Sequence, residues 1–260
     1  MAAPIPAGVS IAAAGVPASE CPLLRSGTGA YAIYEQGLRA ADEKLRARLE
    51  SAMETVREAL RRYGPQSVAV SFNGGKDCTV LVFLLVAALD QLSPARPEIR
   101  DRPVKALYVT SDNPFPEIDA FVEFFAKMFG LDLMEILGRM KPALERFLDS
   151  NRIVKAILVG TRRTDPYASK LESFSATDNG WPPVMRVHPL LDWDYDDVWG
   201  AIRVLRLPYC SLYDHGFTSI GSMSDTAPNP LLKSADAARG FLPAHMLKDG
   251  AQERSGRLSK

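Results

Sequence analysis

The sequence predicts an α/β fold built on a mostly parallel, twisted sheet with helices on both faces. Two observations predict this class. Short apolar runs rich in β-branched residues alternate along the chain with longer segments of helical periodicity, which is the pattern of successive βαβ units. Apolar residues make up 47% and charged residues 24% of the 260 residues, so the chain can fill the core of an ordinary globular domain.

A long amphipathic helix is the first predicted element, from Leu38 to Leu60. Its apolar residues recur at steps of three and four, which places them in one stripe, and its other face is charged. A Gly-Pro pair at positions 64–65 ends it. We therefore expect residues 31–64 to form an N-terminal helix docked on the core. Residues 1–30 are rich in Ala, Pro, Gly and Ser and are expected to form a flexible tail.

The rest of the chain alternates between expected strands and helices. The strands, predicted from their length and β-branched content, are Ser67–Phe72, Val104–Val109, Leu131–Leu137, Ala156–Val159 and Val184–Val187. The helices are Lys76–Gln91, Pro116–Phe129, Lys141–Asp149 and Tyr195–Leu205, and a loop is expected over 94–103. This alternation implies parallel strands whose carboxyl ends meet at one edge of the sheet, where α/β proteins bind their ligands.

Charge and composition exclude several classes of function. Lys and Arg number 31, as do Asp and Glu, so a nucleic-acid partner, which requires a basic excess, is not expected. The longest apolar run, Val80–Leu89, has ten residues, whereas a membrane span needs about 20. The three cysteines lie far apart without metal-ligand spacing, and the N-terminus lacks the features of a secretory or transit signal. We expect a reduced, cytoplasmic protein that acts on small molecules as a monomer or weak homodimer.

The loop after the first predicted strand carries the run S-F-N-G-G-K-D at residues 71–77. Two adjacent glycines between a strand and a helix permit a tight turn and leave backbone N–H groups uncovered, and such groups at a helix N-terminus bind anions. Lys76 adds a positive charge. The pattern lacks the glycine spacing of a Walker A loop and its following Ser or Thr. A plain strand-to-helix turn is the alternative, but the polar residues around the glycines favour an anion site.

The run S-F-x-G-G-K-D resembles the pyrophosphate-loop signature of the adenosine-nucleotide α-hydrolases, which include PAPS reductases, sulfate adenylyltransferase subunits, tRNA thiolases and GMP synthetases. Asn73 stands where that signature usually has Ser, and Cys78 replaces the Ser after Lys-Asp. In these departures the sequence resembles the eukaryotic FAD synthase branch. The resemblance implies a Rossmann-like pyrophosphate-loop domain over residues 65–225 and a C-terminal extension, residues 226–260, that closes over the active site.

Further runs resemble the same branch in the same order. Residues 160–166, G-T-R-R-T-D-P, match its G-x-R-x-x-D-P pattern, and residues 189–193, P-L-L-D-W, match P-L-x-x-W. Residues 216–221 resemble G-x-T-S-I-G, and residues 253–257 resemble a terminal E-R-x-x-R. Taken singly, each run could also be an ordinary turn or a solvated segment. Their common order makes the resemblance specific.

The resemblance implies an FMN adenylyltransferase, which makes FAD and pyrophosphate from ATP and FMN with Mg²⁺. It assigns to catalysis Asn73, Asp77, Asp165, Arg254 and Arg257, with Asp77 also a magnesium ligand. It assigns to the nucleotide Ser71, Phe72, Gly74, Gly75, Lys76, Val109 and Gly160, and to the flavin Arg163, Asp165, Met185, Arg186, Asp192 and Trp193. The alternatives are another pyrophosphate-loop enzyme, such as a PAPS reductase-like protein, or a non-catalytic module that binds an adenine nucleotide or a flavin.

Overall fold

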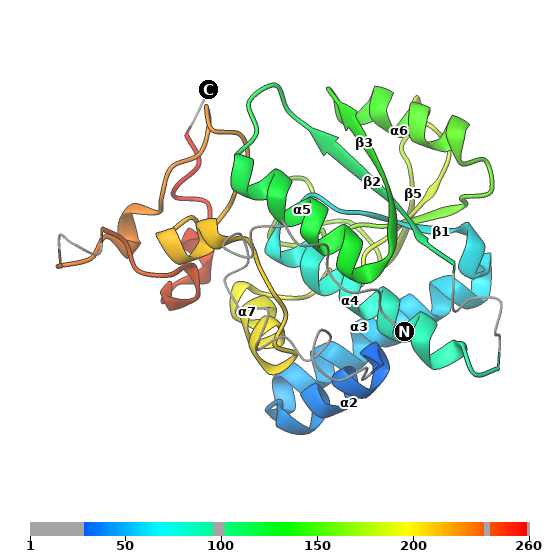
Figure 1. Ribbon diagram of the computed structural model, residues 1–260, viewed down its shortest axis with the longest axis horizontal. Helices are drawn as coiled ribbons and strands as arrows, with labels where there is room; N and C mark the ends of the chain where they lie inside the picture. The colour runs from blue at the N-terminus through cyan, green and yellow to red at the C-terminus, as the bar shows by residue number, and fades with distance from the viewer. Residues whose placement is uncertain (1–28, 96–101, 237–239, 259–260) are drawn as a thin grey trace.

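The computed structural model describes residues 29–95, 102–236 and 240–258. At its centre is a six-stranded sheet in the order β3-β2-β1-β4-β6-β5 (Figure 1). The strands are β1 (Val68–Ser71), β2 (Val104–Thr110), β3 (Leu131–Leu137), β4 (Ala156–Leu158), β5 (Phe174–Ala176) and β6 (Met185–Val187). Every neighbouring pair is parallel except β5 and β6, which are antiparallel. The predicted α/β class is confirmed. Residues 1–28 of the tail predicted over 1–30 and most of the loop predicted over 94–103 lie outside the described residues, and Ala30 begins α2 rather than ending a tail.

Helices cover both faces of the sheet, as predicted. They are α2 (Ala30–Ala40), α3 (Glu43–Tyr63), α4 (Lys76–Leu92), α5 (Pro116–Phe129), α6 (Met140–Ser150) and α7 (Tyr195–Val204). Side chains alternate across a strand, so Val68 and Val70 of β1 enter the larger core with α2, α3, α4, α5 and α7. Ala69 faces the other way, into a smaller core with residues of α6.

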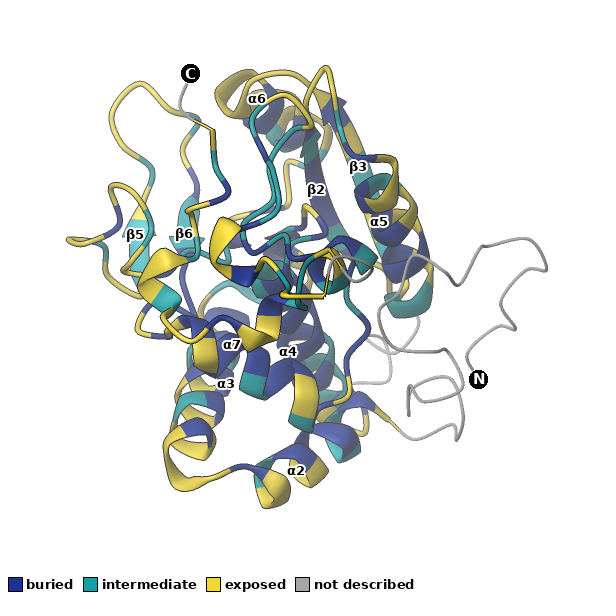
Figure 2. Ribbon diagram, turned by 90° about the vertical axis from the view of Figure 1, so that its left-hand side faces the viewer, coloured by how far each residue is buried: buried dark blue, intermediate teal, exposed yellow. Residues whose placement is uncertain are grey.

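Helix α4 runs through the middle of the larger core. Its residues from Val80 to Leu85 are at most 1% exposed, and it packs against α2, α3 and α7. Figure 2 shows the middle of α4 buried, whereas α2 and α3 each keep an exposed side. This position explains why the sequence of α4 is apolar on all sides rather than amphipathic. Among the described residues, no helix has both the length and the apolar character to cross a membrane.

Two features differ from the prediction. The single helix predicted from Leu38 to Leu60 is two helices, α2 and α3, because Asp42 starts a new one: its carboxylate accepts a hydrogen bond from the N–H of Leu45 at 2.8 Å. The apolar periodicity continues across the break because both helices pack on the same core. Strand β5 is absent from the prediction, since a three-residue strand shows no pattern and forms through its pairing with β6.

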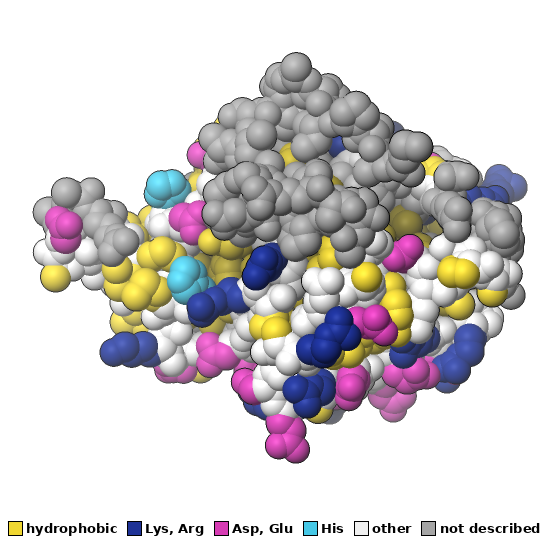
Figure 3. Space-filling model, turned by 60° about the horizontal axis from the view of Figure 1, so that its bottom comes forward, with side chains coloured by type: hydrophobic (Ala, Val, Ile, Leu, Met, Phe, Trp, Pro, Cys, Tyr) yellow, Lys and Arg dark blue, Asp and Glu magenta, His cyan; other side chains and the backbone are white. Residues whose placement is uncertain are grey.

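The lower surface of the molecule, as drawn in Figure 1, carries mixed charges. Figure 3 shows Lys and Arg interspersed with Asp and Glu over this face. On α3, Arg61 pairs with Glu54 at 2.6 Å and with Glu58 at 2.5 Å, and Arg62 pairs with Glu58 at 2.5 Å. Exposed pairs of this kind contribute about 0–1 kcal/mol each, so the charged side of α3 is a solvated face.

The segment after α7 returns to the edge of the sheet that carries the glycine-rich loop. The ring of Phe217 meets that of Phe115, which precedes α5, at 5.4 Å between centroids. Near the chain end, Arg257 forms an isolated antiparallel bridge with Thr226. The orange and red segments of Figure 1 therefore lie together, beside the loops that follow β1 and β2.

Candidate active site

The loop between β1 and α4 is shaped by its own residues. Gly74 has a φ of +72°, a region that favours glycine, and a Cβ there would lie 2.9 Å from Cγ2 of Val122. The side-chain oxygen of Asn73 accepts a hydrogen bond from the N–H of Gly75 at 3.0 Å, which is an Asx turn. Gly75 is in turn the N-cap of α4. The loop thus delivers the N-terminus of α4 to the carboxyl edge of the sheet.

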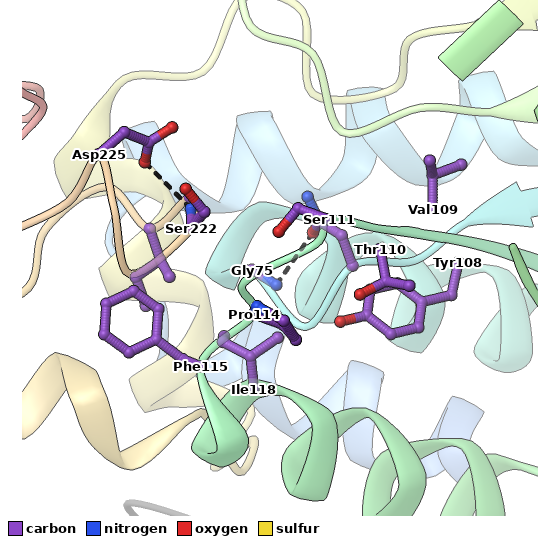
Figure 4. Close-up of a pocket in the computed structure, with 13 residues that line it drawn as sticks. Gly75, Tyr108, Val109, Thr110, Ser111, Pro114, Phe115, Ile118, Ser222 and Asp225 are labelled. Atoms are coloured by element: carbon purple, nitrogen blue, oxygen red, sulfur yellow. Dashed lines mark hydrogen bonds between the residues drawn. The ribbon is translucent and has the colours of Figure 1, made fainter. Parts of the chain in front are cut away.

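A pocket of about 330 Å³ opens between this loop, the end of β2 and residues 220–225. In Figure 4, Phe115 and Ile118 form an apolar side of the pocket, and Thr110 and Ser222 bring polar groups to it. A slot with apolar walls and a few polar groups suits a flat heteroaromatic ring. Val109, which the resemblance assigns to the nucleotide, lines this pocket.

Arg257 and Asp225 form an ion pair at the side of this first pocket. Nη2 of Arg257 lies 3.2 Å from Oδ2 of Asp225, and a Cβ at Gly221 would collide with the guanidinium group. Burial alone would raise the pKa of Asp225, but a hydrogen bond from the hydroxyl of Thr226 and the charge of Arg257 hold it below its ordinary value. Asp225 is therefore ionised and keeps the guanidinium against the wall of the pocket.

Four charged side chains form a buried cluster at the N-terminus of α4. Nζ of Lys76 lies 2.9 Å from Oδ2 of Asp77 and contacts Oε1 of Glu253. Nε of Arg162 lies 2.8 Å from Oδ1 of Asp77, and its Nη2 contacts Oε2 of Glu253. The side chains of the two cations are 2% and 3% exposed, and those of Asp77 and Glu253 are 19% and 12% exposed. The four groups form a ring of alternating charge whose formal sum is zero.

Electrostatics favour the charged forms of Asp77 and Arg162. Burial alone would raise the pKa of Asp77, but Lys76 and Arg162 outweigh it and hold that pKa below its ordinary value. Burial would lower the pKa of Arg162, but Asp77 and Glu253 raise it instead. Two buried cations thus stand at a helix N-terminus, where the helix dipole also favours negative charge, and both are paired with carboxylates in this structure.

A second pocket, of about 390 Å³, adjoins the cluster through Arg162 and Glu253. Asp165 and Arg254 also line it, and Oδ2 of Asp165 accepts a hydrogen bond from the N–H of Arg162 at 2.8 Å. Gly75 lines the first pocket, and the next residue in the chain belongs to the cluster. The loop at 73–77 therefore lies between the two pockets.

The residues that the resemblance assigns to catalysis lie around these two pockets. Asn73 lines the first pocket, Asp165 and Arg254 line the second, and Asp77 belongs to the cluster. Arg257 does not line either described pocket, but it forms an ion pair with Asp225, which lines the first. Of the two arginines of the E-R-x-x-R run, Arg254 therefore lines the second pocket, whereas Arg257 pairs with a residue of the first.

Several assigned side chains lie elsewhere. Phe72 is 0% exposed and stacks on Phe125 with ring centroids 5.0 Å apart, and Trp193 is 3% exposed in the larger core. Their rings are occupied by packing in the core, and the ligand roles of Phe72 and Trp193 stay predictions. Ser71 ends β1. Gly160 follows β4 where a Cβ would lie 3.2 Å from Sγ of Cys78, so it permits a close approach to α4.

Most of the side chains assigned to the flavin are not among the residues that line the two described pockets. Nε of Arg163 lies 2.7 Å from Oδ1 of Asp192, and the two side chains are 43% and 59% exposed. Met185 and Arg186 lie on β6, where the guanidinium of Arg186 donates a hydrogen bond to the carbonyl oxygen of Ala176 at 2.8 Å. Among the predicted flavin residues, Asp165 is the one that lines a described pocket. The flavin role of the others stays a prediction.

Sequence reasoning missed four residues of the site. They are Arg162, Tyr213, Asp225 and Glu253. The hydroxyl of Tyr213 accepts a hydrogen bond from the N–H of Lys76 at 2.9 Å. The N–H of Gly75, which the sequence predicts to be uncovered, is likewise engaged by the side chain of Asn73. Burial raises the pKa of Tyr213 well above its ordinary value. Arg162 and Glu253 stand within the runs G-T-R-R-T-D-P and E-R-S-G-R, but the resemblance assigns site roles to their neighbours.

Comparison with known proteins bears on this site. A family model described as the phosphoadenosine phosphosulfate reductase domain matches residues 67–149 and 140–228. A probable FAD synthase from Schizosaccharomyces pombe is 39% identical over 213 residues, which cover 82% of this chain and 80% of that protein. A probable FAD synthase from Caenorhabditis elegans is 36% identical over 81% of this chain, but the match spans only 40% of that longer protein.

A solved structure has the same architecture. The FMN adenylyltransferase of Candida glabrata in complex with FAD and inorganic pyrophosphate superposes with a TM-score of 0.82 and 25% sequence identity. The match covers 89% of this chain and 95% of that chain. The family match contains the glycine-rich loop, Arg162 and Asp225 but ends before Glu253.

Proposed function

Because the chain belongs to the FAD synthase family and carries the phosphoadenosine phosphosulfate reductase domain, we propose that it transfers the adenylyl group of ATP to FMN, which forms FAD and releases pyrophosphate. One observation carries the proposal. The two buried cations Lys76 and Arg162 form an anion site at the N-terminus of α4, and a pocket lies on each side of the loop that holds it. Two substrates joined through phosphate groups need this arrangement.

We assign the adenosine part of ATP to the first pocket and the phosphate end of FMN to the second. The first pocket has apolar walls and the backbone at Val109, which suit adenine. The second has Arg162 and Arg254, whose planar guanidinium groups meet phosphate oxygens two at a time. The phosphates of ATP would then cross the N-terminus of α4 between the pockets.

The chemistry follows from this arrangement. A terminal phosphate oxygen of FMN attacks the α-phosphorus of ATP in line, and the bond from that phosphorus to the bridging oxygen breaks, so that its electron pair leaves with pyrophosphate. The nucleophile is already ionised at neutral pH, so no general base is needed. The protein has to position the two anions and neutralise their charge. Arg254 and Arg257 would counter charge that develops on the phosphorus centre.

The residues present also fit Mg²⁺, which we propose as the metal of the reaction. Mg²⁺ takes hard oxygen ligands and is commonly held by one or two carboxylates together with substrate phosphates. Asp77 supplies an ionised carboxylate beside the proposed phosphate site. When bound there, the metal would neutralise phosphate charge.

No observation favours a reductase of the same domain family. Such an enzyme would need a reactive thiolate, and Cys210 is the last cysteine of the sequence. Burial raises the pKa of Cys210 to about 12, and burial together with the charge of Asp77 does the same for Cys78. Neither thiol is activated for nucleophilic attack.

We further propose that the protein works in the cytoplasm as a monomer or weak homodimer. The free thiols of Cys78 and Cys210 support a reducing compartment. Residues of one chain line both described pockets, which supports a site that is complete within one subunit.

A product assay tests the function. The purified full chain is incubated with ATP, FMN and MgCl₂, and flavins are separated by chromatography while pyrophosphate is measured enzymatically. The expected result is FAD and pyrophosphate in equal amounts, with little product from the Asp77→Asn variant. Folded wild-type protein that converts no FMN under these conditions would show that the proposed function is wrong.

A further inference from the structure

The buried cluster contains an acidic side chain where an anion is expected to bind. Glu253 directs one carboxylate oxygen to Nζ of Lys76 and the other to Nη2 of Arg162. These are the cations that we assign to phosphate groups. A carboxylate and a phosphate oxygen make the same kind of charged hydrogen bond to such donors, so Glu253 and a bound phosphate chain cannot both hold them fully.

We propose that Glu253 is an internal competitor for phosphate, which occupies Lys76 and Arg162 when the site has no ligand and must be displaced when ATP or pyrophosphate binds. The inference rests on the proposed function, because that function supplies the identity of the anion. By this reasoning, the return of Glu253 to the two cations after adenylyl transfer promotes the release of pyrophosphate.

The surroundings of Glu253 allow its side chain to move while its backbone stays in place. The carbonyl oxygen of Glu253 accepts a hydrogen bond from Oγ1 of Thr218 at 2.6 Å. The side chain of Asn229 donates to the carbonyl oxygen of Gln252 at 2.9 Å. The carboxylate borders the open second pocket and is 12% exposed. Displacement therefore needs rotation about side-chain bonds and no refolding of the chain end.

The charge of the cluster explains why displacement matters. With Glu253 in place, two positive and two negative groups cancel, and an incoming polyanion meets no net positive charge. With Glu253 displaced, Lys76, Asp77 and Arg162 together carry one net positive charge. A ligand that binds only the displaced state must also supply the free energy of displacement. Its apparent Kd is the Kd for the displaced state divided by the fraction of chains in that state.

Titration calorimetry with inorganic pyrophosphate tests the proposal on the full chain. Glu253→Gln removes the competing charge and keeps the shape of the side chain, and Glu145→Gln makes the same chemical change at an exposed position of α6. We expect Glu253→Gln to bind pyrophosphate at least about tenfold more tightly than the wild type, and Glu145→Gln to match the wild type.

Steady-state kinetics provide a second readout that a merely structural role would not produce. Glu253→Gln should show a lower KM for ATP and stronger inhibition by pyrophosphate, together with a lower kcat because the product leaves more slowly. Loss of a structural contact alone would instead raise KM or leave it unchanged. An unchanged or higher KM for ATP in the folded variant would therefore contradict the proposal.

The outcomes separate this proposal from the proposed function. If the wild type forms FAD and folded Glu253→Gln binds pyrophosphate no more tightly than the wild type, the competitor role is refuted and the function stands. If the wild type forms no FAD, the proposed function is wrong. The competitor role of Glu253 is then still tested by comparing the pyrophosphate affinities of the wild type and Glu253→Gln. If Glu253→Gln does not fold, Glu253→Asp takes its place. Its shorter side chain keeps the negative charge but reaches Lys76 and Arg162 less well, so we expect it to bind pyrophosphate more tightly than the wild type. An equal or lower affinity for pyrophosphate would refute the competitor role.

Discussion

Replacing Arg162 and its neighbour Arg163 by glutamine, one at a time, separates the inward arginine from the outward one. The side chain of Arg162 is 3% exposed, its Nε lies 2.8 Å from Asp77, and it also contacts Glu253. The side chain of Arg163 is 43% exposed, and its partner Asp192 is 59% exposed. The two residues are adjacent in the sequence and carry the same charge, so each variant is a control for the other.

The expected costs differ several-fold. Removing one partner of a buried ion pair leaves uncompensated charge and costs about 3–5 kcal/mol, and we expect a value near the lower end because Asp77 and Glu253 remain 19% and 12% exposed. An exposed pair such as Arg163–Asp192 contributes about 0–1 kcal/mol. Urea unfolding measures both free energies. In the product assay, Arg162→Gln should lose at least ~10²-fold in kcat, and Arg163→Gln should stay within about threefold of the wild type.

The comparison can refute the reasoning in two ways. Equal losses of unfolding free energy would show that Arg162 is not held in a buried ion-pair cluster. A larger loss of FAD formation in Arg163→Gln than in Arg162→Gln would show that the outward arginine is the one that meets the substrate, as the sequence suggests.

Three further predictions follow from particular residues. Gly74→Ala should lower the free energy of unfolding, measured by urea titration, by about 1–3 kcal/mol, because Gly74 has a positive φ and an added Cβ would approach Val122. Gly130→Ala is the control: Gly130 has a φ of +62° but no atom lies within 4 Å of the position of a Cβ, so this change should cost less. Equal costs would show that the contact with Val122 does not matter. Burial and the charge of Arg186 lower the pKa of His188 from 6.5 to about 4, so between these pH values the unfolded chain binds a proton that the folded chain does not. The free energy of unfolding should therefore fall by roughly 3 kcal/mol as the pH drops from 6.5 to 4. His188→Gln should remove this dependence on pH, and an unchanged slope of unfolding free energy against pH would exclude His188 as its source. FMN should bind at least about tenfold more tightly than riboflavin in calorimetry, since charged hydrogen bonds to its phosphate are worth about 1.5–3 kcal/mol each; equal affinities would exclude a phosphate contact.

Much of the fold could be predicted from the sequence because its signals are local. The five longer or more apolar strands are visible from β-branched content, and α4 is visible as an apolar run of helical length. The break at Asp42 was missed because the apolar stripe continues through it, although Asp followed by Glu43 is an N-cap signal. Strand β5 depends on its neighbour, which no local pattern reports.

The residues of the candidate site also differ in whether local sequence signals reveal them. The loop at 73–77 is contiguous, so its glycines and Lys76 could be predicted from spacing. The choice between two adjacent arginines depends on the turn that Asp165 stabilises by accepting the N–H of Arg162, and sequence alone does not show which one points inward. Glu253 meets Lys76 across a separation of 177 residues, a contact that exists only in the folded chain.

Isotope transfer from labelled ATP is the most direct test of adenylyl transfer to FMN. The purified full chain is given FMN, Mg²⁺ and ATP labelled with ³²P at either the α- or the γ-phosphate, and the flavin and pyrophosphate fractions are counted. We predict that the α-label appears in FAD and the γ-label in pyrophosphate, both dependent on FMN. Appearance of the γ-label in the flavin fraction, or release of the α-label as free AMP with no labelled flavin, would contradict adenylyl transfer.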